Sequence, residues 1–255
     1  MKAEGKNIFE GREKFSGVYK KHTTVDNYFS KRFGGPMAHA SHLQEITLIN
    51  KILRSIPPTG KILEIAPGPA RLSTMISYEG VKMGIDRSRE MLEVARERLQ
   101  GKNWCLIEGD AFLTPFPRDS FNIVMMFRFF RHFYLQDRES LLTEVRRISK
   151  KGGFLVFEAL NNNMPPLARR YMRIGQSEVY DELWNWDELK EELNNFGWEV
   201  VAVWPILSHF KISYLIDKLF SPFGRTSIIG VKLINLMDKI STKDAYQWDV
   251  LCRKI

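Results

Sequence analysis

The segment KILEIAPGPAR, residues 61–71, constrains the possible folds of this chain more than any other part of its sequence. Leu63-Glu64-Ile65 has the apolar character of a buried strand with one acid inside it, and residues 66–70 form a turn of alanine, proline and glycine. Residues 72–78 then resume with helical potential. A strand, a small-residue turn and a helix start make up the phosphate- or nucleoside-binding corner of doubly wound α/β folds.

The composition of this turn indicates which ligand it could hold. A dinucleotide loop has the pattern Gly-x-Gly-x-x-Gly, and here only Gly68 is present. Glu64, directly before the turn, would repel the negative charge of a pyrophosphate. The acid suits a cationic or neutral adenosine-type ligand better, which disfavours a nicotinamide dinucleotide.

Length and composition predict one packed domain, or one domain with an added subdomain. The chain has 255 residues, of which 44% are hydrophobic and 12% aromatic, so it can bury a core and is not expected to be disordered. Its two cysteines, Cys105 and Cys252, build no disulfide framework and are expected to be buried thiols. No run approaches the roughly 20 apolar residues of a membrane span, and the N-terminus does not resemble a signal peptide. We therefore expect a cytoplasmic protein.

The net charge of +8 is carried by the two ends of the chain. Residues 1–36 hold 8 Lys and Arg against 4 Asp and Glu, residues 205–255 again hold 8 against 4, and residues 37–204 hold 22 of each. The basic flanks favour an anionic substrate, an acidic membrane surface or a nucleic acid. Solvated basic ends without a role are an equal alternative.

Strand and helix patterns alternate along the middle of the chain, which is typical of a mostly parallel sheet covered on both faces. Helices are expected over residues 24–32, 39–56, 88–99, 137–149 and 187–196. Strands are expected over residues 63–65, 81–86, 104–109, 121–127, 154–158, 198–204 and 246–252. The pattern predicts an α/β fold with a doubly wound, mostly parallel seven-stranded sheet and a helical insertion before the last strand.

Residues 205–245 interrupt the alternation with two apolar stripes at helical spacing. The stripes are Ile212, Leu215, Ile216, Leu219 and Phe220, and then Ile229, Leu233, Leu236, Met237 and Ile240. Such stripes usually pack on the same molecule. The functional alternative is a lid or a membrane-touching helical hairpin, because the polar positions include several lysines.

Three acids fall at or near the ends of predicted strands: Glu64, Asp86 and Asp110. The carboxyl ends of neighbouring parallel strands share one rim, so these side chains can converge on one ligand. Asp86 is placed to accept hydrogen bonds from a ribose diol. Asp110 can accept from an exocyclic amine while Phe112 offers an apolar wall to a purine. Alone, each acid would more often be a cap or a surface charge.

With these motifs in place, the sequence resembles the class I S-adenosylmethionine-dependent methyltransferases of the small-molecule type, with a domain similar to methyltransferase type 11. The similarity covers residues 40–160 well and 187–204 moderately. It rests on LEIAPGPA at 63–70, GIDRS at 84–88 with Met91, GDAF at 109–112, FNIV at 121–124 with its continuation to 133, and EVRRI at 144–148.

The resemblance implies S-adenosylmethionine as cofactor and S-adenosylhomocysteine as product. His39 and His42 lie three residues apart but have no third clustered ligand, so no metal site is expected. The resemblance also implies cofactor contacts by Glu64, Ala66, Pro67, Gly68, Asp86, Arg87, Met91, Asp110, Ala111, Phe112 and Phe127. Three positions depart from the family pattern, because the outer glycines of its first motif are Ala66 and Ala70 here, and the usual aspartate of its fourth strand is Asn122. Those alanines must avoid a strongly positive φ or bear strain.

Methyl transfer from a sulfonium proceeds by in-line attack, so the site must mainly align acceptor and methyl in a dry pocket. A general base is needed only for a hydroxyl or a protonated amine, and His132 is the candidate by position. Arg128 and Arg131 could bind an acceptor carboxylate or phosphate. Tyr28 and Arg32 could contact the substrate, in an N-terminal segment that folds over the cofactor as in similar proteins. Arg138, Arg146 and Arg147 are expected on solvent-facing helix surfaces.

These observations predict methyl transfer to a small or lipid-linked, anionic acceptor. The alternatives are a tRNA or other nucleic-acid methyltransferase, and a non-catalytic cofactor-binding protein with a degenerate glycine motif. No base-flipping motif or RNA module supports the nucleic-acid alternative. The expected domains are an arm over the cofactor (1–40), the α/β core (41–204), an insertion that forms a lid or touches a membrane (205–245), and the last strand (246–255). The location would then be cytoplasmic, with peripheral membrane contact as an option.

Overall fold

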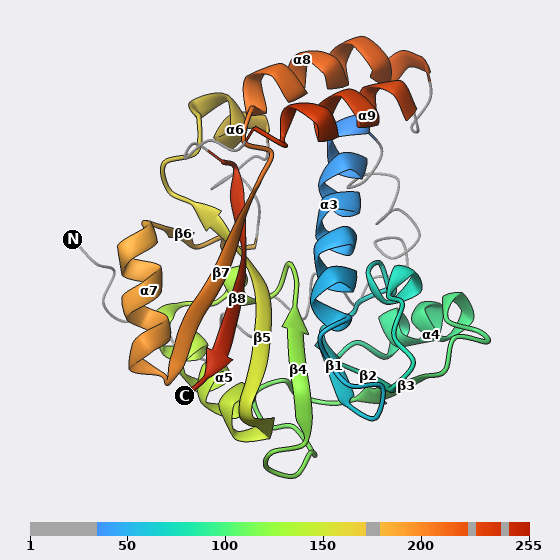
Figure 1. Ribbon diagram of the computed structural model, residues 1–255, viewed down its shortest axis with the longest axis vertical. Helices are drawn as coiled ribbons and strands as arrows, with labels where there is room; N and C mark the ends of the chain where they lie inside the picture. The colour runs from blue at the N-terminus through green and yellow to red at the C-terminus, as the bar shows by residue number, and fades with distance from the viewer. Residues whose placement is uncertain (1–34, 172–178, 224–227, 241–244) are drawn as a thin grey trace.

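A computed structural model describes residues 35–171, 179–223, 228–240 and 245–255 (Figure 1). Within these residues the strands form one 8-stranded sheet with the order β3-β2-β1-β4-β5-β8-β7, and the short β6 pairs with β5. The first five strands of this order run parallel, and β8 is antiparallel to both β5 and β7. The expected mostly parallel α/β fold is confirmed. The additional strand β6 was not predicted, because two residues carry no periodic signal.

The element bounds follow the predicted alternation. The strands are β1 (Lys61–Ile65), β2 (Val81–Asp86), β3 (Trp104–Glu108), β4 (Phe121–Met126), β5 (Ser149–Asn161), β6 (Leu183–Trp184), β7 (Trp198–Ile206) and β8 (Gln247–Lys254). The α-helices are α3 (Pro36–Leu53), α4 (Arg89–Arg98), α5 (Leu135–Ile148), α6 (Pro166–Tyr171), α7 (Trp186–Asn195), α8 (Phe210–Phe220) and α9 (Ile228–Met237). Three short 3₁₀ helices are η1 (Ser73–Met75), η2 (Phe130–His132) and η3 (Ser221–Phe223). The helix expected over residues 24–32 lies outside the described residues.

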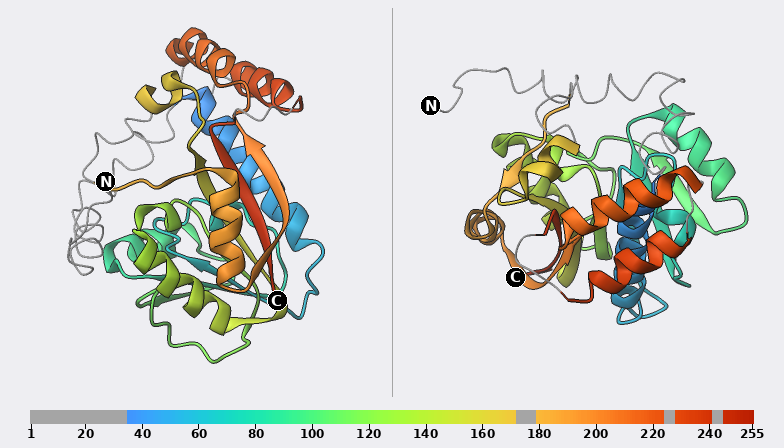
Figure 2. Two further views of the ribbon diagram at one scale, coloured as in Figure 1. Left: turned by 90° about the vertical axis from the view of Figure 1, so that its left-hand side faces the viewer. Right: turned by 90° about the horizontal axis from the view of Figure 1, so that it is seen from above.

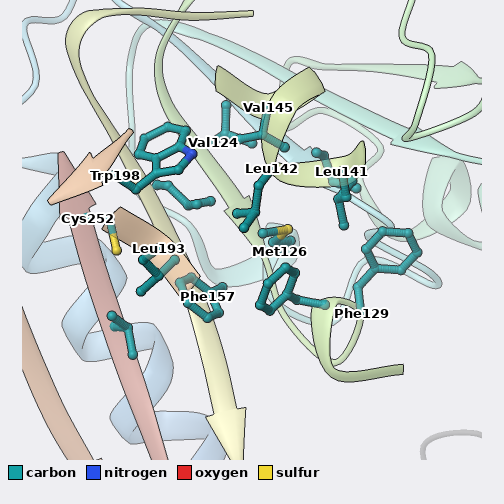
Figure 3. Close-up of a cluster of buried hydrophobic side chains, with 14 of the residues drawn as sticks. Val124, Met126, Phe129, Leu141, Leu142, Val145, Phe157, Leu193, Trp198 and Cys252 are labelled. Atoms are coloured by element: carbon teal, nitrogen blue, oxygen red, sulfur yellow. The ribbon is translucent and has the colours of Figure 1, made fainter. Parts of the chain in front are cut away.

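Alternating side chains of β4 build a hydrophobic core on each face of the sheet. Val124 and Met126 belong to a cluster with Leu141 and Leu142 of α5, shown in Figure 3. Ile123 and Met125, the neighbours of these residues along β4, instead join the cluster formed with α3 on the other face of the sheet. Burial on both faces explains why this strand is almost entirely apolar.

The ends of two helices follow local chemistry. Ser88 is the N-cap of α4, and its Oγ accepts a hydrogen bond of 3.2 Å from Met91 N. Helix α3 begins at Pro36, three residues before the predicted start. Proline suits the first turn of a helix because the backbone donor that it lacks would have no partner there.

The helix expected over residues 72–78 is reduced to the single turn η1. Ile76 leaves the turn in an extended conformation with φ −72 and ψ 123. Tyr78 is buried, and its hydroxyl donates to Pro57 O at 2.6 Å. Burial of these two side chains draws the segment toward the core, so the prediction of a longer helix was wrong.

Two further expectations about exposure were wrong. Arg138 is buried and forms ion pairs with Glu182 at 2.6 Å and Glu192 at 2.7 Å, although its helix was expected to expose it. Cys105 is exposed on β3, while Cys252 is buried as expected. Strand β3 lies at one edge of the sheet, where one face of the strand is incompletely covered.

The insertion before β8 forms two helices that lie side by side across the N-terminal end of α3 (Figures 1 and 2). The pattern favoured stripes packed on the same molecule, and this holds only in part, since Ile216 packs against a buried cluster while most of the stripe residues do not. Leu215, Leu219, Leu236 and Ile240 are exposed, and the buried positions are others on the same helices. Within the described residues, no helix combines the length and apolarity that crossing a membrane requires.

Candidate active site

A pocket opens at the carboxyl ends of β1, β2, β3 and β4, where the topology brings the strand-end acids together. All of the residues predicted to contact the cofactor line it: Glu64, Ala66, Pro67, Gly68, Asp86, Arg87, Met91, Asp110, Ala111, Phe112 and Phe127. Arg128, predicted for the substrate, lines the same pocket. The convergence predicted for Glu64, Asp86 and Asp110 is thus observed, and the further residues implied by the family resemblance lie in the same pocket.

Glu64 closes the inner end of the pocket. Its side chain is buried and accepts a hydrogen bond of 2.5 Å from Ser73 Oγ in η1. Burial raises the pKa of Glu64 to about 7, and the hydrogen bond from Ser73 opposes part of that rise. The carboxyl group therefore exchanges its proton near neutral pH, and a cationic ligand would favour its ionised form.

Asp86 joins the end of β2 to the turn after β1. Its Oδ2 accepts from Gly68 N at 2.9 Å, and its Oδ1 accepts from Ser88 N at 2.9 Å. Burial raises the pKa of Asp86, although these backbone hydrogen bonds favour the carboxylate. A carboxylate has further lone pairs, so Asp86 can still accept hydrogen bonds from a ligand.

The turn itself holds three residues in the left-handed region: Ala66 with φ 52, Gly68 with φ 54 and Ala70 with φ 59. The two alanines adopt backbone conformations that usually belong to glycine. Of the expected alternatives, avoiding a positive φ or bearing strain, they therefore show the second. A Cβ at Gly68 would meet no atom within 4 Å, so the turn faces open space there. The backbone of the turn thus lies open to a bound molecule.

Asp110 and Phe112 form the opposite wall. Asp110 Oδ1 accepts from Phe112 N at 2.9 Å, which fixes the local turn. The ring of Phe112 packs edge-to-face on Phe133, with centroids 5.1 Å apart. A flat apolar side chain beside a carboxylate suits a heteroaromatic base that carries an amino group.

Arginines line the far side of the pocket. Arg71 Nη1 lies 2.5 Å from Glu45 Oε2 and 2.8 Å from His42 Nδ1, both on α3. Burial and the nearby Arg71 lower the pKa of His42 to about 4. Arg128 follows β4 with φ 56, and its backbone N–H donates to Glu158 Oε2 at 2.8 Å. Glu158 of β5 thus holds the strained backbone at Arg128.

His132 and Arg131 do not line the pocket. Arg131 is buried between Glu158 at 3.1 Å and Asp181 at 3.0 Å. His132 Nδ1 lies 2.8 Å from Tyr180 O and 3.2 Å from Asp181 Oδ1. Burial lowers the pKa of His132, so its ring is neutral at pH 7. The other predicted substrate residues, Tyr28 and Arg32, lie outside the described residues.

Comparison with known proteins gives the family. Residues 63–157 match the family model described as a methyltransferase domain. The chain is 34% identical over 114 residues to a demethylmenaquinone methyltransferase of Thermotoga maritima, an alignment that covers 44% of this chain and 47% of that protein. It is 30% identical over 168 residues to the enzyme of the same name from Streptomyces avermitilis, covering 57% of this chain and 71% of that enzyme. The chain belongs to the class I S-adenosylmethionine-dependent methyltransferases.

Solved methyltransferase structures share the fold of this methyltransferase chain. A phosphoethanolamine N-methyltransferase 2 of Haemonchus contortus, solved with S-adenosyl-L-methionine, superposes with a TM-score of 0.66 at 18% identity, covering 96% of this chain and 59% of that chain. A geranyl diphosphate methyltransferase superposes with a TM-score of 0.59 at 11% identity, covering 84% of this chain and 78% of that one. The chain spans about half the length of the Thermotoga maritima relative, 47%.

Sequence reasoning missed several side chains of this methyltransferase site. Arg71, Leu72, Phe129 and Phe133 line the pocket, and Glu158 supports it from β5. The only signal for Arg71 was its place directly after the small-residue turn, and a buried glutamate in an apolar strand could have pointed to Glu158. Within the described part of the chain, no group of three or more His, Cys, Asp or Glu side chains could hold a metal ion.

Proposed function

We propose that this chain transfers a methyl group from S-adenosylmethionine to a small or lipid-linked, anionic acceptor. The observation that carries the proposal is the convergence of Glu64, Asp86 and Asp110 on one pocket beside the open backbone at Gly68. The pocket offers carboxylates and an aromatic wall, and its acids suit a ligand with positive charge and several donors. When bound, the cofactor would supply a methyl group whose carbon an acceptor attacks in line, with S-adenosylhomocysteine as the leaving group.

The residues of the pocket would divide the work of binding. Glu64 would accept from the ammonium group of the methionine moiety, and Asp86 from the ribose hydroxyls. Asp110 would accept from the adenine amine while Phe112 covers the ring. Phe127, Phe129 and Phe133 contribute an apolar lining, which excludes water from the reacting atoms. Arg87, Met91 and Ala111 complete the walls.

An anionic acceptor is supported by Arg128, which lines the pocket after β4. The two relatives described above are named demethylmenaquinone methyltransferases, which favours a lipid-linked aromatic acceptor. The reduced form of such a quinone ionises to a phenolate, which makes the ring electron-rich and anionic. A lipid-linked acceptor lies in a membrane, so a cytoplasmic protein would need contact with the membrane surface to reach it. The cytoplasmic location and the peripheral membrane contact are both part of this proposal.

We propose that His132 acts on an acceptor that must lose a proton only through a relay, because its buried side chain does not line the pocket and cannot touch the acceptor directly. Because Nδ1 lies within hydrogen-bond reach of Tyr180 O and Asp181, the tautomer with hydrogen on Nδ1 leaves Nε2 as the basic nitrogen. A His132→Gln variant should lose kcat and the acidic limb of its pH profile, while its affinity for S-adenosylhomocysteine stays unchanged. Loss of cofactor affinity instead would assign His132 a structural role.

Calorimetry and labelled methyl transfer test the function directly. We expect ligand-free protein to bind S-adenosylmethionine, and to transfer labelled methyl to reduced demethylmenaquinone in detergent micelles. An absence of cofactor binding would refute the proposal. Binding without transfer to any acceptor would favour the non-catalytic alternative, and label in tRNA would favour a nucleic-acid methyltransferase.

A further inference from the structure

The helical hairpin α8–α9 carries an apolar surface that nothing in the described structure covers. Of the exposed large hydrophobic side chains, six form what we call the outer face of the hairpin: Ile212, Leu215, Leu219, Ile229, Leu233 and Leu236. Leu215 is 65% exposed and Leu219 64%. Contiguous exposed apolar surface of this kind marks a site of interaction with a partner or membrane.

The outer face lies opposite the side by which the hairpin is anchored. On α8 the buried residues are Phe210, Ser213 and Asp217, whereas Ile212, Leu215 and Leu219 follow one another at helical spacing on the other side. On α9 the buried residues are Gly230, Val231 and Ile234. Both helices lie across α3 (Figures 1 and 2). Their buried residues are on the side toward α3, so the two exposed apolar stripes face away from the body of the protein.

Hydrogen bonds fix the orientation of the hairpin. Asp217 Oδ1 accepts from Met37 N at 2.9 Å, at the start of α3. Asp238 Oδ2 accepts from Leu207 N and from Gln44 Nε2, each at 3.0 Å. The acids of these helices thus point toward the protein, and the outward display of the apolar stripes is built into the fold.

The charges around the outer face all have one sign in the described part of the hairpin. Lys211 and Lys218 are exposed on α8, and Lys232 and Lys239 are exposed on and just after α9. Asp217 and Asp238, the acids of residues 210–223 and 228–240, are both engaged in the anchoring contacts. An apolar stripe bordered by lysines is complementary to an anionic lipid surface, which attracts the lysines while the leucines enter the acyl boundary.

The hairpin also lies at the end of the sheet that carries the pocket. It connects the end of β7 to the start of β8, and Ile206 and Gln247 pair there beside Leu160 near the end of β5. Because β5 is parallel to β4, this is the carboxyl end of the parallel strands, the end at which the pocket opens. A membrane against the outer face would therefore lie on the same side of the protein as the candidate site.

We propose that the outer face of the α8–α9 hairpin binds the surface of a bilayer that contains anionic phospholipids. The leucines and isoleucines insert into the interface, and the four lysines contact lipid phosphates. The proposal goes beyond methyl transfer, because docking needs neither cofactor nor acceptor. In this proposal the protein binds the membrane peripherally, through one surface and without a membrane-spanning helix.

Vesicle co-sedimentation of the full chain tests the proposal. The vesicles contain phosphatidylcholine alone or an equimolar mixture with phosphatidylglycerol. We expect binding to the mixed vesicles that weakens in high salt, and much weaker binding to phosphatidylcholine. The variant L215S/L219S/L236S should bind mixed vesicles roughly tenfold or more weakly. The variant K211Q/K218Q/K232Q/K239Q should lose the preference for phosphatidylglycerol.

A matched control is V81S/V201S/V203S, which removes the same number of exposed aliphatic side chains from β2 and β7. It should bind like the parent chain, and melting curves and binding of S-adenosylhomocysteine should be the same in all variants. Parent chain that stays in the supernatant, or an L215S/L219S/L236S variant that binds as the parent does, would overturn the proposal. So would a parent dimer that becomes monomeric in that variant, because a second copy would then cover the face. Vesicle binding is measured without cofactor, so it does not depend on whether methyl transfer occurs.

Discussion

Asp86 Oδ2 accepts a hydrogen bond of 2.9 Å from the backbone N–H of Gly68. This contact joins the end of β2 to the strained turn after β1, so the residue predicted to hold a ribose also holds the loop that would approach the ligand. Gly68 stands at φ 54 with open space where a side chain would be. The hydrogen bond therefore fixes the Asp86 side chain and the Gly68 backbone relative to each other.

Asp86→Ala should weaken binding of S-adenosylhomocysteine by roughly 1–3 kcal/mol, the size of losing hydrogen bonds to a buried charged group. Titration calorimetry measures the change. Asp187→Ala is the control, because the Asp187 side chain is 92% exposed on α7 and pairs with Lys190 at the surface. Unchanged affinity in Asp86→Ala would show that the ribose lies elsewhere.

Cofactor affinity should depend on pH through Glu64. Burial raises the pKa of Glu64 to about 7, and only the ionised carboxylate can accept from an ammonium group without losing a proton first. The dissociation constant for S-adenosylmethionine should therefore rise about fivefold from about pH 7 to pH 6. Calorimetry at the two pH values measures it. The Glu64→Gln variant should bind more weakly and show no such dependence.

The same residue should lower the stability of the folded chain as pH rises. The pKa of Glu64 is about 7 when folded against 4.5 ordinarily, so between these values the folded state holds more protons than the unfolded state. Stability contributed at this site is present below about pH 4.5 and is lost as pH rises through 7, by roughly 2–3 kcal/mol. Compared with the parent, Glu64→Gln should gain this amount of unfolding free energy between about pH 5 and pH 8. Parallel urea-unfolding profiles for the two proteins would contradict the shifted pKa.

The strained alanines should respond differently to glycine. Ala66→Gly removes a left-handed alanine that costs roughly 1–2 kcal/mol, against a loss of about 0.5–1 kcal/mol in backbone entropy. Ala70→Gly also removes a fully buried methyl that packs with Ala95 and Leu99, worth about 0.8 kcal/mol, whereas the methyl of Ala66 is only partly buried. Urea unfolding should show Ala66→Gly slightly stabilised and Ala70→Gly near neutral. If the two variants changed the unfolding free energy by the same amount, the backbone strain at Ala66 and Ala70 would have to differ, which would contradict this prediction.

Arg138→Ala should destabilise the fold by about 3 kcal/mol, because it empties the buried site of Arg138 and leaves two partly buried carboxylates without their cation. Arg138 donates to both oxygens of Glu192, at 2.7 and 2.9 Å, and to Glu182 at 2.6 Å. Thermal and urea unfolding measure the loss. Arg118→Ala, at an exposed loop position, should stay within about 0.5 kcal/mol of the parent. A small effect at Arg138 would show that these acids find other partners.

Local patterns were sufficient for the order of strands and helices. The apolar run of β4 and the serine cap of α4 follow from short-range chemistry, because each depends on neighbours along the chain. The convergence of Glu64, Asp86 and Asp110 was also predictable, since parallel strands place their ends at one rim. The turn at 72–78 was not, because burial of Ile76 and Tyr78 by other elements replaced a local helix preference.

The sequence by itself thus determined the alternating α/β core and the acids at its strand ends, through periodicity and topology rules that act within short segments. Only the tertiary structure decided whether a charged side chain or an apolar helix stripe is buried or exposed. Arg138 is buried because Glu182 and Glu192 reach it from across the fold. The leucines of α8 and α9 face outward because α3 takes the opposite sides of both helices. Helical spacing defines a face, but only the packed neighbour determines which face is covered.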